Sequence, residues 1–278
     1  MSAFNITTGT DGLAVLSFDS DRTEECIKYA LSHNIKRISL IDSYYHENLL
    51  PLLPLKNVLE GLILNDKVDF AALCQFRRLC YLGALDNGKN QIDLSCFPNL
   101  ETLACNITIR LKALESCKML KSLTVSRYNG VGNLRGLPPL HSLEHLSLIK
   151  TSVNELAGVE LFSNLQRLEL YCAPALKTIA ALTSLTQLKE LSIEACKKVT
   201  DYAALGRIDT LEKILLTNSG EIPSLAFIKS LLHLRFISFV GTNVRDGDIS
   251  HCAGLEYVGF DDKRHYNRKM RDFQRQGV

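Results

Sequence analysis

The stretch LKELSIEACKKVTDYAALGRIDTL, residues 188–211, contains two hydrophobic periods, one after the other. Its first half places apolar residues at Leu188, Leu191 and Ile193, in the pattern L-x-x-L-x-L. Its second half places them at every third position from Val199 to Leu211. Alternation with period two predicts a strand, whereas a spacing of three suits a tight helical turn such as a 3₁₀ helix. The stretch therefore predicts a short strand followed by a short helical return.

The same pattern recurs along the chain at intervals of 20 to 24 residues. In the second half it begins at residues 143, 165, 188, 211, 234 and 255, which are 22, 23, 23, 23 and 21 residues apart. In the first half a looser form begins at residues 35, 59, 79, 100 and 120, with spacings of 24, 20, 21 and 20. A regular period of this length is typical of repeat proteins, in which each unit packs only on its neighbours.

Over about residues 35–262 the chain resembles the leucine-rich repeat family. The resemblance implies an α/β fold, a curved right-handed solenoid of about 10 to 11 repeats of 20 to 24 residues. A parallel sheet would form its concave face, and short helices or 3₁₀ turns its convex face. The family often carries an asparagine after the strand, which ties down the loop. Here that place is mostly taken by other residues, so we expect mixed loop contacts: Thr151, Ala173, Cys196, Ser219 and Thr242.

A single repeat cannot bury the leucines of both its halves, so stacking must build one continuous core. Strands lie about 4.8 Å apart, and eleven of them would form a face roughly 50 Å long. The two ends of such a stack need caps. We expect one structural domain in three parts: an N-terminal cap at residues 1–34, the solenoid at 35–262, and a basic cap or tail at 263–278.

The N-terminal cap is expected to contain a strand at residues 13–18 and then a helix that begins near Asp21, with Glu24 completing a capping box. The basic tail is interpreted as a solvated cap, with contact to phosphate or an acidic partner as the alternative. The closing stretch, residues 239–261, resembles the end of bacterial leucine-rich-repeat proteins without an assigned activity.

Composition restricts the classes of function. Net charge is +2, from 32 basic and 30 acidic residues, which gives no reason to expect nucleic acid or an anionic membrane as partner. No signal peptide and no apolar run of about 20 residues is visible, so a cytoplasmic protein is expected. The nine cysteines are scattered, and we expect reduced thiols that pack as small core residues, Cys172 and Cys196 among them.

Positions three, five and seven of each L-x-x-L-x-L unit are expected to point out of the sheet, because side chains alternate along a strand. In the later repeats these positions hold charged and aromatic residues, whereas residues 102–126 hold small ones. Arginine and aromatic side chains carry much of the energy of protein interfaces. The residues predicted to bind a partner are His145, Arg167, Glu169, Tyr171, Glu190, Glu194, Lys213, Phe236, Tyr257 and Asp261.

Two patterns of charged residues could be either structural or part of a functional site. Glu169, Glu190 and Glu194 could cluster for acid–base chemistry or cation binding, but Arg167 and Lys213 flank them, which favours a charge-balanced network. At position two of successive repeats the charges largely alternate in sign. These side chains predict a ladder of ion pairs between neighbouring strands and no binding site.

Taken together, the sequence favours a protein–protein interaction module that binds a partner protein on the concave face. We expect no enzyme, catalytic residue, metal or cofactor, and no nucleic acid, membrane or small-molecule substrate. Ribonuclease inhibitors of the family cover the active site of an enzyme, so the resemblance implies an inhibitor or immunity-type role in a bacterium. The alternatives are a scaffold in a larger assembly and a cation-dependent enzyme that uses the three glutamates.

Overall fold

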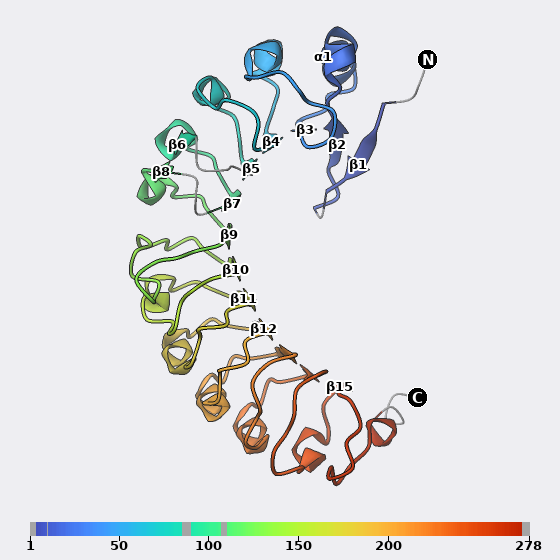
Figure 1. The fold of residues 1–278 in the computed structure, drawn as a ribbon, viewed down its shortest axis with the longest axis vertical. Helices are drawn as coiled ribbons and strands as arrows, with labels where there is room; N and C mark the ends of the chain where they lie inside the picture. The colour runs from blue at the N-terminus through green and yellow to red at the C-terminus, as the bar shows by residue number, and fades with distance from the viewer. Residues whose placement is uncertain (1–3, 10, 85–89, 107–109, 274–278) are drawn as a thin grey trace. The chain divides into compact units, whose positions relative to one another are not determined.

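The structure is a computed structural model and describes residues 4–9, 11–84, 90–106 and 110–273. The chain divides into two compact units, Met1–Thr124 and Val125–Val278. In each unit short strands alternate with 3₁₀ helices, and the strands of a unit lie side by side (Figure 1). Within the described ranges, no helix has the length and hydropathy that a membrane crossing requires.

The first unit forms a sheet in the order β1-β2-β3-β4-β5-β7, in which only the β1–β2 pair is antiparallel. β6 and β8 form a separate two-stranded parallel sheet. The elements are β1 (Ile6–Thr8), β2 (Ala14–Ser17), η1 (Ser20–Arg22), α1 (Thr23–Ser32), β3 (Arg37–Ser39), η2 (Leu50–Leu55), β4 (Gly61–Leu64), η3 (Leu73–Gln75), β5 (Tyr81–Ala84), β6 (Gln91–Asp93), η4 (Leu94–Cys96), β7 (Thr102–Asn106), β8 (Arg110–Lys112) and η5 (Leu114–Ser116). β9 (Ser122–Ser126) crosses the boundary between the units.

The second unit has a parallel sheet in the order β10 to β15. Equivalent motif positions pair in register, so that His145 lies opposite Arg167, and Arg167 opposite Glu190. The elements are β10 (His145–Ile149), η6 (Val159–Leu161), β11 (Arg167–Tyr171), η7 (Ala180–Ser184), β12 (Glu190–Glu194), η8 (Tyr202–Arg207), β13 (Lys213–Thr217), η9 (Ala226–Ser230), β14 (Phe236–Ser238), η10 (Ile249–Cys252), β15 (Tyr257–Gly259) and η11 (Met270–Asp272).

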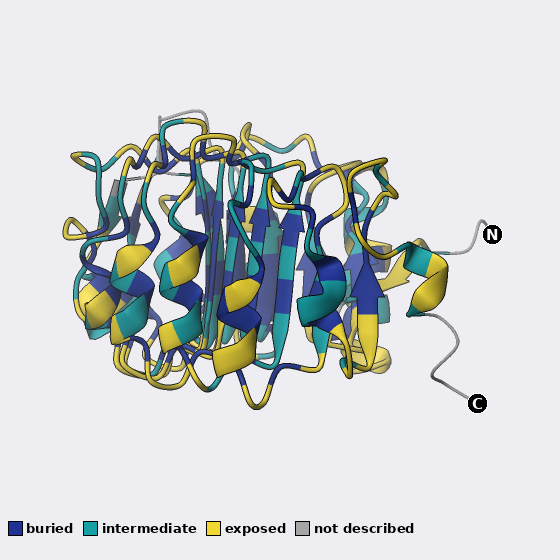
Figure 2. Ribbon diagram, turned by 90° about the horizontal axis from the view of Figure 1, so that it is seen from below, coloured by how far each residue is buried: buried dark blue, intermediate teal, exposed yellow. Residues whose placement is uncertain are grey.

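The leucine-rich-repeat pattern is confirmed strand by strand from β3 to β15, with the separate β6 and β8 as additions. Motif positions one, four and six form the core, and Leu165, Leu168 and Leu170 of one repeat are all fully buried. The helical return is 3₁₀, as the spacing of three predicts, and α1 is the one α-helix in the described part of the chain. Figure 2 shows buried residues along the strands and exposed residues on the outer turns of the helices.

The N-terminal segment differs in detail from its prediction. The strand expected at residues 13–18 is β2, but β1, which pairs with it, was not foreseen. The capping box expected from Asp21 and Glu24 is wrong: Asp19 accepts the Asp21 N–H and starts η1, and α1 begins only at Thr23. The polar side chain that begins the turn thus lies two residues earlier than the sequence spacing suggested.

A left-handed residue follows most strands of the second unit and was missed by the sequence analysis. Its N–H donates to the last carbonyl of the next strand, as Lys150 N does to Tyr171 O at 2.7 Å and Cys172 N to Glu194 O at 2.9 Å. Only Asn and Gly adopt this conformation readily, and most of these positions hold neither. The left-handed residues are Arg127, Lys150, Cys172, Ala195, Asn218 and Gly241.

The side chain of the next residue along binds a backbone carbonyl of the preceding repeat, and different residue types make this contact, as predicted. Thr151 donates its hydroxyl to Tyr128 O at 2.8 Å, and Thr242 donates to Leu216 O at 2.6 Å. Ser219 donates to the Ile193 carbonyl at 3.0 Å, in the same way. Side chains shorter than asparagine therefore satisfy the same class of buried carbonyl.

Two expectations for the cysteines are wrong. Cys74 and Cys96, in the neighbouring 3₁₀ helices η3 and η4, form a disulfide. Cys172 is exposed, because it occupies the left-handed position and the adjacent core place belongs to Ala173. Cys196 occupies that core place in its own repeat and is buried, and its burial raises the pKa of the thiol to about 11.

The described part of the basic segment, residues 263–273, packs against the last repeats. Tyr266 is buried, and its hydroxyl accepts the N–H of Val244 at 2.9 Å. Phe273 packs edge-on against Phe260, whose ring also stacks on Phe239. The interpretation of this segment as a cap stays a prediction, and Arg275 lies outside the described residues.

Candidate protein-binding face

The candidate site is the face of the second unit's sheet that points away from the 3₁₀ helices. We call it the open face, and it consists of motif positions three, five and seven of β10–β15. The opposite positions are buried beneath the helices, which leaves the side chains of the open face half-buried or exposed, apart from the buried Ser147 and Gly259. Because the strands pair in register, equivalent positions form rows across the sheet.

A charge-balanced network occupies the centre of the open face, as the sequence predicted. Arg167 Nη2 lies 2.9 Å from Glu190 Oε1, and Lys213 Nζ lies 3.9 Å from Glu190 Oε2. His145 Nε2 lies 3.2 Å from Glu169 Oε2. The hydrogen bond from His145 lowers the pKa of Glu169, against an opposing effect of partial burial. Each carboxylate in these pairs has a basic neighbour on an adjacent strand.

An aromatic stack forms the far end of the open face. The rings of Phe236 and Tyr257 lie 4.2 Å apart and are inclined by only 8°. Lys213 Nζ lies 5.3 Å from the centroid of Phe236, within the range of a cation–π contact. A Cβ at Gly259 would lie 2.9 Å from the Tyr257 ring, so glycine is what allows this ring to lie along the strand. The stack is held in place before any partner arrives.

A shallow hollow of about 100 Å³ lies within the charge network, over β11, β12 and β13. Ligand pockets usually have volumes of about 300–1,000 Å³. The hollow therefore suits one side chain of a partner better than a small molecule. Burial raises the pKa of Tyr171 in its wall, and the charge of Glu169 adds to this effect. The residues that line it are Arg167, Glu169, Tyr171, Glu190, Leu191, Ser192, Lys213 and Leu215.

Glu194 and Asp261 differ from the other predicted residues. Glu194 lies at the end of β12, outside the lining of the hollow. Asp261 accepts the N–H of Gly241 through Oδ2 at 2.7 Å. Gly241 is the last left-handed residue of the series. Its N–H donates to the Asp261 carboxylate, whereas the N–H groups of the earlier left-handed residues donate to a backbone carbonyl of the next repeat. Asp261 thus has a capping role that the motif alone could not reveal.

The three glutamates do not form an isolated carboxylate cluster. Glu169 and Glu190 have basic partners, and Glu194 lies apart from the hollow. Within the part of the chain that the structure describes, no group of three His, Cys, Asp or Glu side chains is placed to hold a metal ion. Leu191, Ser192 and Leu215 complete the lining but were not predicted, because Leu191 is a core position of the motif and the other two are of types common on exposed strand faces.

The equivalent face of the first unit is partly covered. Arg37, expected to point outward, is 6% exposed, since its guanidinium is bound by both carboxylate oxygens of Asp11 at 3.0 and 2.7 Å. Its other face lies 4.2 Å from the ring centroid of Tyr81. Gly61 makes this possible, as a Cβ there would lie 2.7 Å from Arg37 Nε. The arginine therefore ties the β1–β2 hairpin to the sheet.

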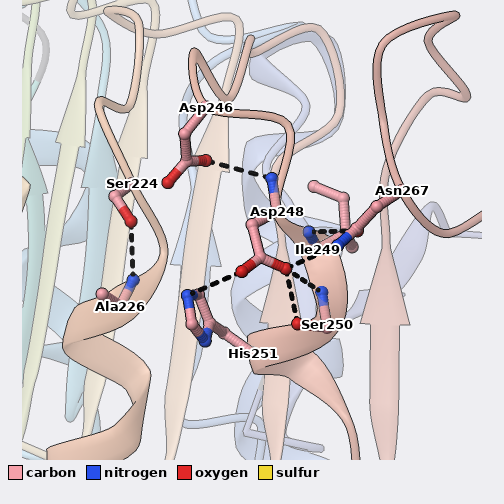
Figure 3. A network of polar contacts seen from close by, with 8 residues as sticks. All are labelled: Ser224, Ala226, Asp246, Asp248, Ile249, Ser250, His251 and Asn267. Atoms are coloured by element: carbon pink, nitrogen blue, oxygen red, sulfur yellow. Dashed lines mark hydrogen bonds and ion pairs between the residues drawn. The ribbon is translucent and has the colours of Figure 1, made fainter.

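A second polar network stabilises the last repeat (Figure 3). Asp248 accepts the backbone N–H of Ser250 at 3.1 Å and an Nδ2–H of Asn267 at 2.7 Å. Its other oxygen lies 3.3 Å from His251 Nε2. The hydrogen bonds, that of the Ser250 hydroxyl first, lower the pKa of Asp248 from its ordinary 3.8 to about 2. The carboxylate fastens η10 to the C-terminal cap.

This network predicts a pH dependence of stability. A carboxylate whose pKa is depressed by folding stabilises the protein above its unfolded pKa, and loses that contribution as pH falls through its folded pKa. We expect Asp248→Asn to lower the urea midpoint at pH 7, with an effect that is mostly lost at pH 2 and absent below it. The difference should fall mainly between about pH 4 and about pH 2. Asp209→Asn, at an exposed position in the same unit, is the control and should change neither midpoint. An equal effect of Asp248→Asn at both pH values would contradict this role.

Known proteins of similar structure were found, although none of similar sequence. No family model and no curated protein matches the sequence. An internalin from Listeria monocytogenes matches the structure with a TM-score of 0.58 and 17% identity, over 83% of this chain and 69% of the internalin. A structure of a TLR13–ssRNA complex matches with a TM-score of 0.57 and 18% identity, over 82% of this chain and 33% of TLR13. Both are leucine-rich-repeat proteins.

The chain has the leucine-rich-repeat fold. In this leucine-rich-repeat chain the parallel sheet, the 3₁₀ returns and the repeat length all correspond to the prediction from the sequence. At under 20% identity the likeness extends to the fold and not to the side chains of the open face.

Proposed function

We propose that the open face of the second unit binds a partner protein. The observation that supports this most is the fixed aromatic stack of Phe236 and Tyr257 beside the Lys213–Glu190–Arg167 network. Aromatic and arginine side chains are enriched among the residues that dominate interface energies. A rigid sheet with paired side chains also loses little conformational entropy on binding.

A protein fits this face better than a nucleic acid. The TLR13 structure contains ssRNA, so RNA is the natural comparison. Nucleic acid binding depends on basic groups that neutralise phosphates. Here Arg167 and Lys213 are both engaged by Glu190, and Glu169 and Glu194 add further negative charge. The phosphates of a nucleic acid on the open face would therefore lie close to carboxylates and be repelled by them.

The finer aspects of the role, inhibitor or scaffold, are predictions that only the resemblance to the family supports. An inhibitor of immunity type would bind one enzyme tightly, whereas a scaffold would bind several proteins in an assembly. A non-enzymatic role agrees with carboxylates that are engaged by basic groups. The cytoplasmic location stays a prediction, and the Cys74–Cys96 disulfide weighs against it, because disulfides persist mainly in oxidising compartments.

The test is partner capture followed by an affinity measurement. The protein is used as bait in a lysate of its source organism, and a captured protein is identified by mass spectrometry and purified. We expect Tyr171→Ala with Phe236→Ala to weaken its binding by roughly 30-fold or more, as for residues worth about 2 kcal/mol. The control, Val131→Ala with Leu232→Ala, removes two exposed apolar side chains outside the open face and should bind normally. Equal affinity of the two double variants would exclude the open face as the binding site.

A further inference from the structure

A row of exposed basic side chains lies on the second unit beside the open face, where the strands end. We call it the loop edge, and it is formed by the loops that follow β9, β10, β11 and β12. Its basic residues are Arg127, Lys150, Lys177, Lys197 and Lys198, all of them exposed. The open face itself does not contain them, since each lies in a loop beyond the end of a strand.

Backbone hydrogen bonds hold these loops against one another. Arg127 N donates to Ile149 O, and Lys150 N donates to Tyr171 O, through the series of left-handed residues. Lys177 N donates to Asn154 O, one repeat earlier. Neighbouring strands lie about 4.8 Å apart, so the four loops begin within roughly 15 Å of one another. The basic groups therefore form one strip on a fixed backbone.

The opposite edge of the same sheet, where the strands begin, is neutralised within the protein. Lys189 Nζ lies 3.6 Å from Glu212 Oε1, and Arg235 Nε lies 2.6 Å from Glu256 Oε1, which confirms the ladder predicted for position two. At the loop edge none of the basic side chains has an ion pair with another described residue. Glu155 and Glu194 lie in or beside these loops without an ion pair to these bases, and Asp201 is engaged by Thr178 and by Ile179 N. The basic groups of the loop edge thus stay without an ion-pair partner among the described residues.

We propose that the loop edge binds an acidic segment of a partner protein. Like charges held close together are unfavourable unless a counter-charge relieves them. An acidic polypeptide supplies this negative charge. A single-stranded nucleic acid would also need exposed aromatic rings on which its bases can stack. Tyr128, the aromatic residue in these loops, is 3% exposed and cannot offer such a surface. This role rests on the protein-binding function proposed above and adds the chemistry of the partner.

The test uses a fluorescein-labelled oligoglutamate peptide and fluorescence anisotropy. We expect the protein to bind it at low salt, with an affinity that falls as salt rises. Lys197→Glu with Lys198→Glu should weaken binding at least tenfold. The control reverses the same charge at two exposed positions on the 3₁₀ helices, Arg207→Glu with Lys229→Glu, and should retain binding within about twofold. Equal losses in both variants would show that only net charge matters and would overturn the proposal.

Two further comparisons separate this proposal from the proposed function. An unlabelled oligothymidylate of matched charge should compete poorly, and competition equal to that of oligoglutamate would overturn the choice of an acidic protein. The open-face variant, Tyr171→Ala with Phe236→Ala, should bind the peptide normally. If it does while the charge-reversed variant also binds normally, the loop edge is excluded and the open face is unaffected.

Discussion

Replacing Cys74 and Cys96 together with serine is expected to lower the free energy of unfolding of the first unit by about 3 kcal/mol. The disulfide closes a loop with a sequence separation of 22 and joins two neighbouring 3₁₀ helices, η3 and η4. In the chain-entropy model a cross-link stabilises the protein by restricting the unfolded chain, and a loop of this length accounts for the magnitude. Urea unfolding of the oxidised protein and the double variant measures the effect.

Reductant provides the internal control for this prediction. Reduction of the wild type should reproduce the loss of stability, whereas the same reductant should leave the Cys74→Ser with Cys96→Ser variant unchanged. Titration of the denatured, unreduced wild type should find seven free thiols of the nine cysteines. Nine free thiols in the purified protein, together with indifference to reductant, would show that the bond does not form.

The repeating parts of the fold could be predicted because the buried residues recur in the sequence at a regular period. A one-residue slip would move Leu168 from the core to the open face, so the hydrophobic pattern fixed the register of β11 against its neighbours. Arg167 and Glu190 could be paired in advance for the same reason, since both occupy position three of adjacent repeats. The network on the open face follows from periodicity and charge alone.

The features that were missed depend on contacts that do not follow the repeat. Arg37 occupies an outward position, yet Asp11 of the hairpin covers it from 26 residues away. The disulfide needs the actual distance between two helices, which scattered cysteines do not encode. Ala195 is left-handed because its N–H must reach the next strand, and its side chain gives no signal of this. Tertiary structure overrides local preference at each of these places.

Leu168→Ala is expected to lower the free energy of unfolding of the second unit by about 3 kcal/mol, the usual scale for a leucine deleted from a close-packed core. Leu168 is fully buried in β11 and lies in register with Leu146 on one side and Leu191 on the other. In a stack of repeats, stability is approximately the sum of the repeats and the interfaces between neighbours. A cavity at Leu168 therefore weakens two interfaces at once.

Hydrogen exchange and urea unfolding together measure this effect. Amides of β10, β11 and β12 should lose protection more than those of the terminal strand β15, because coupling in the stack passes from neighbour to neighbour. Leu232→Ala removes the same side chain at a position that is 86% exposed, and it should change stability by less than about 0.5 kcal/mol. If the two variants unfolded at the same urea concentration, the interior placement of Leu168 would be wrong, and with it the register on which the open face depends.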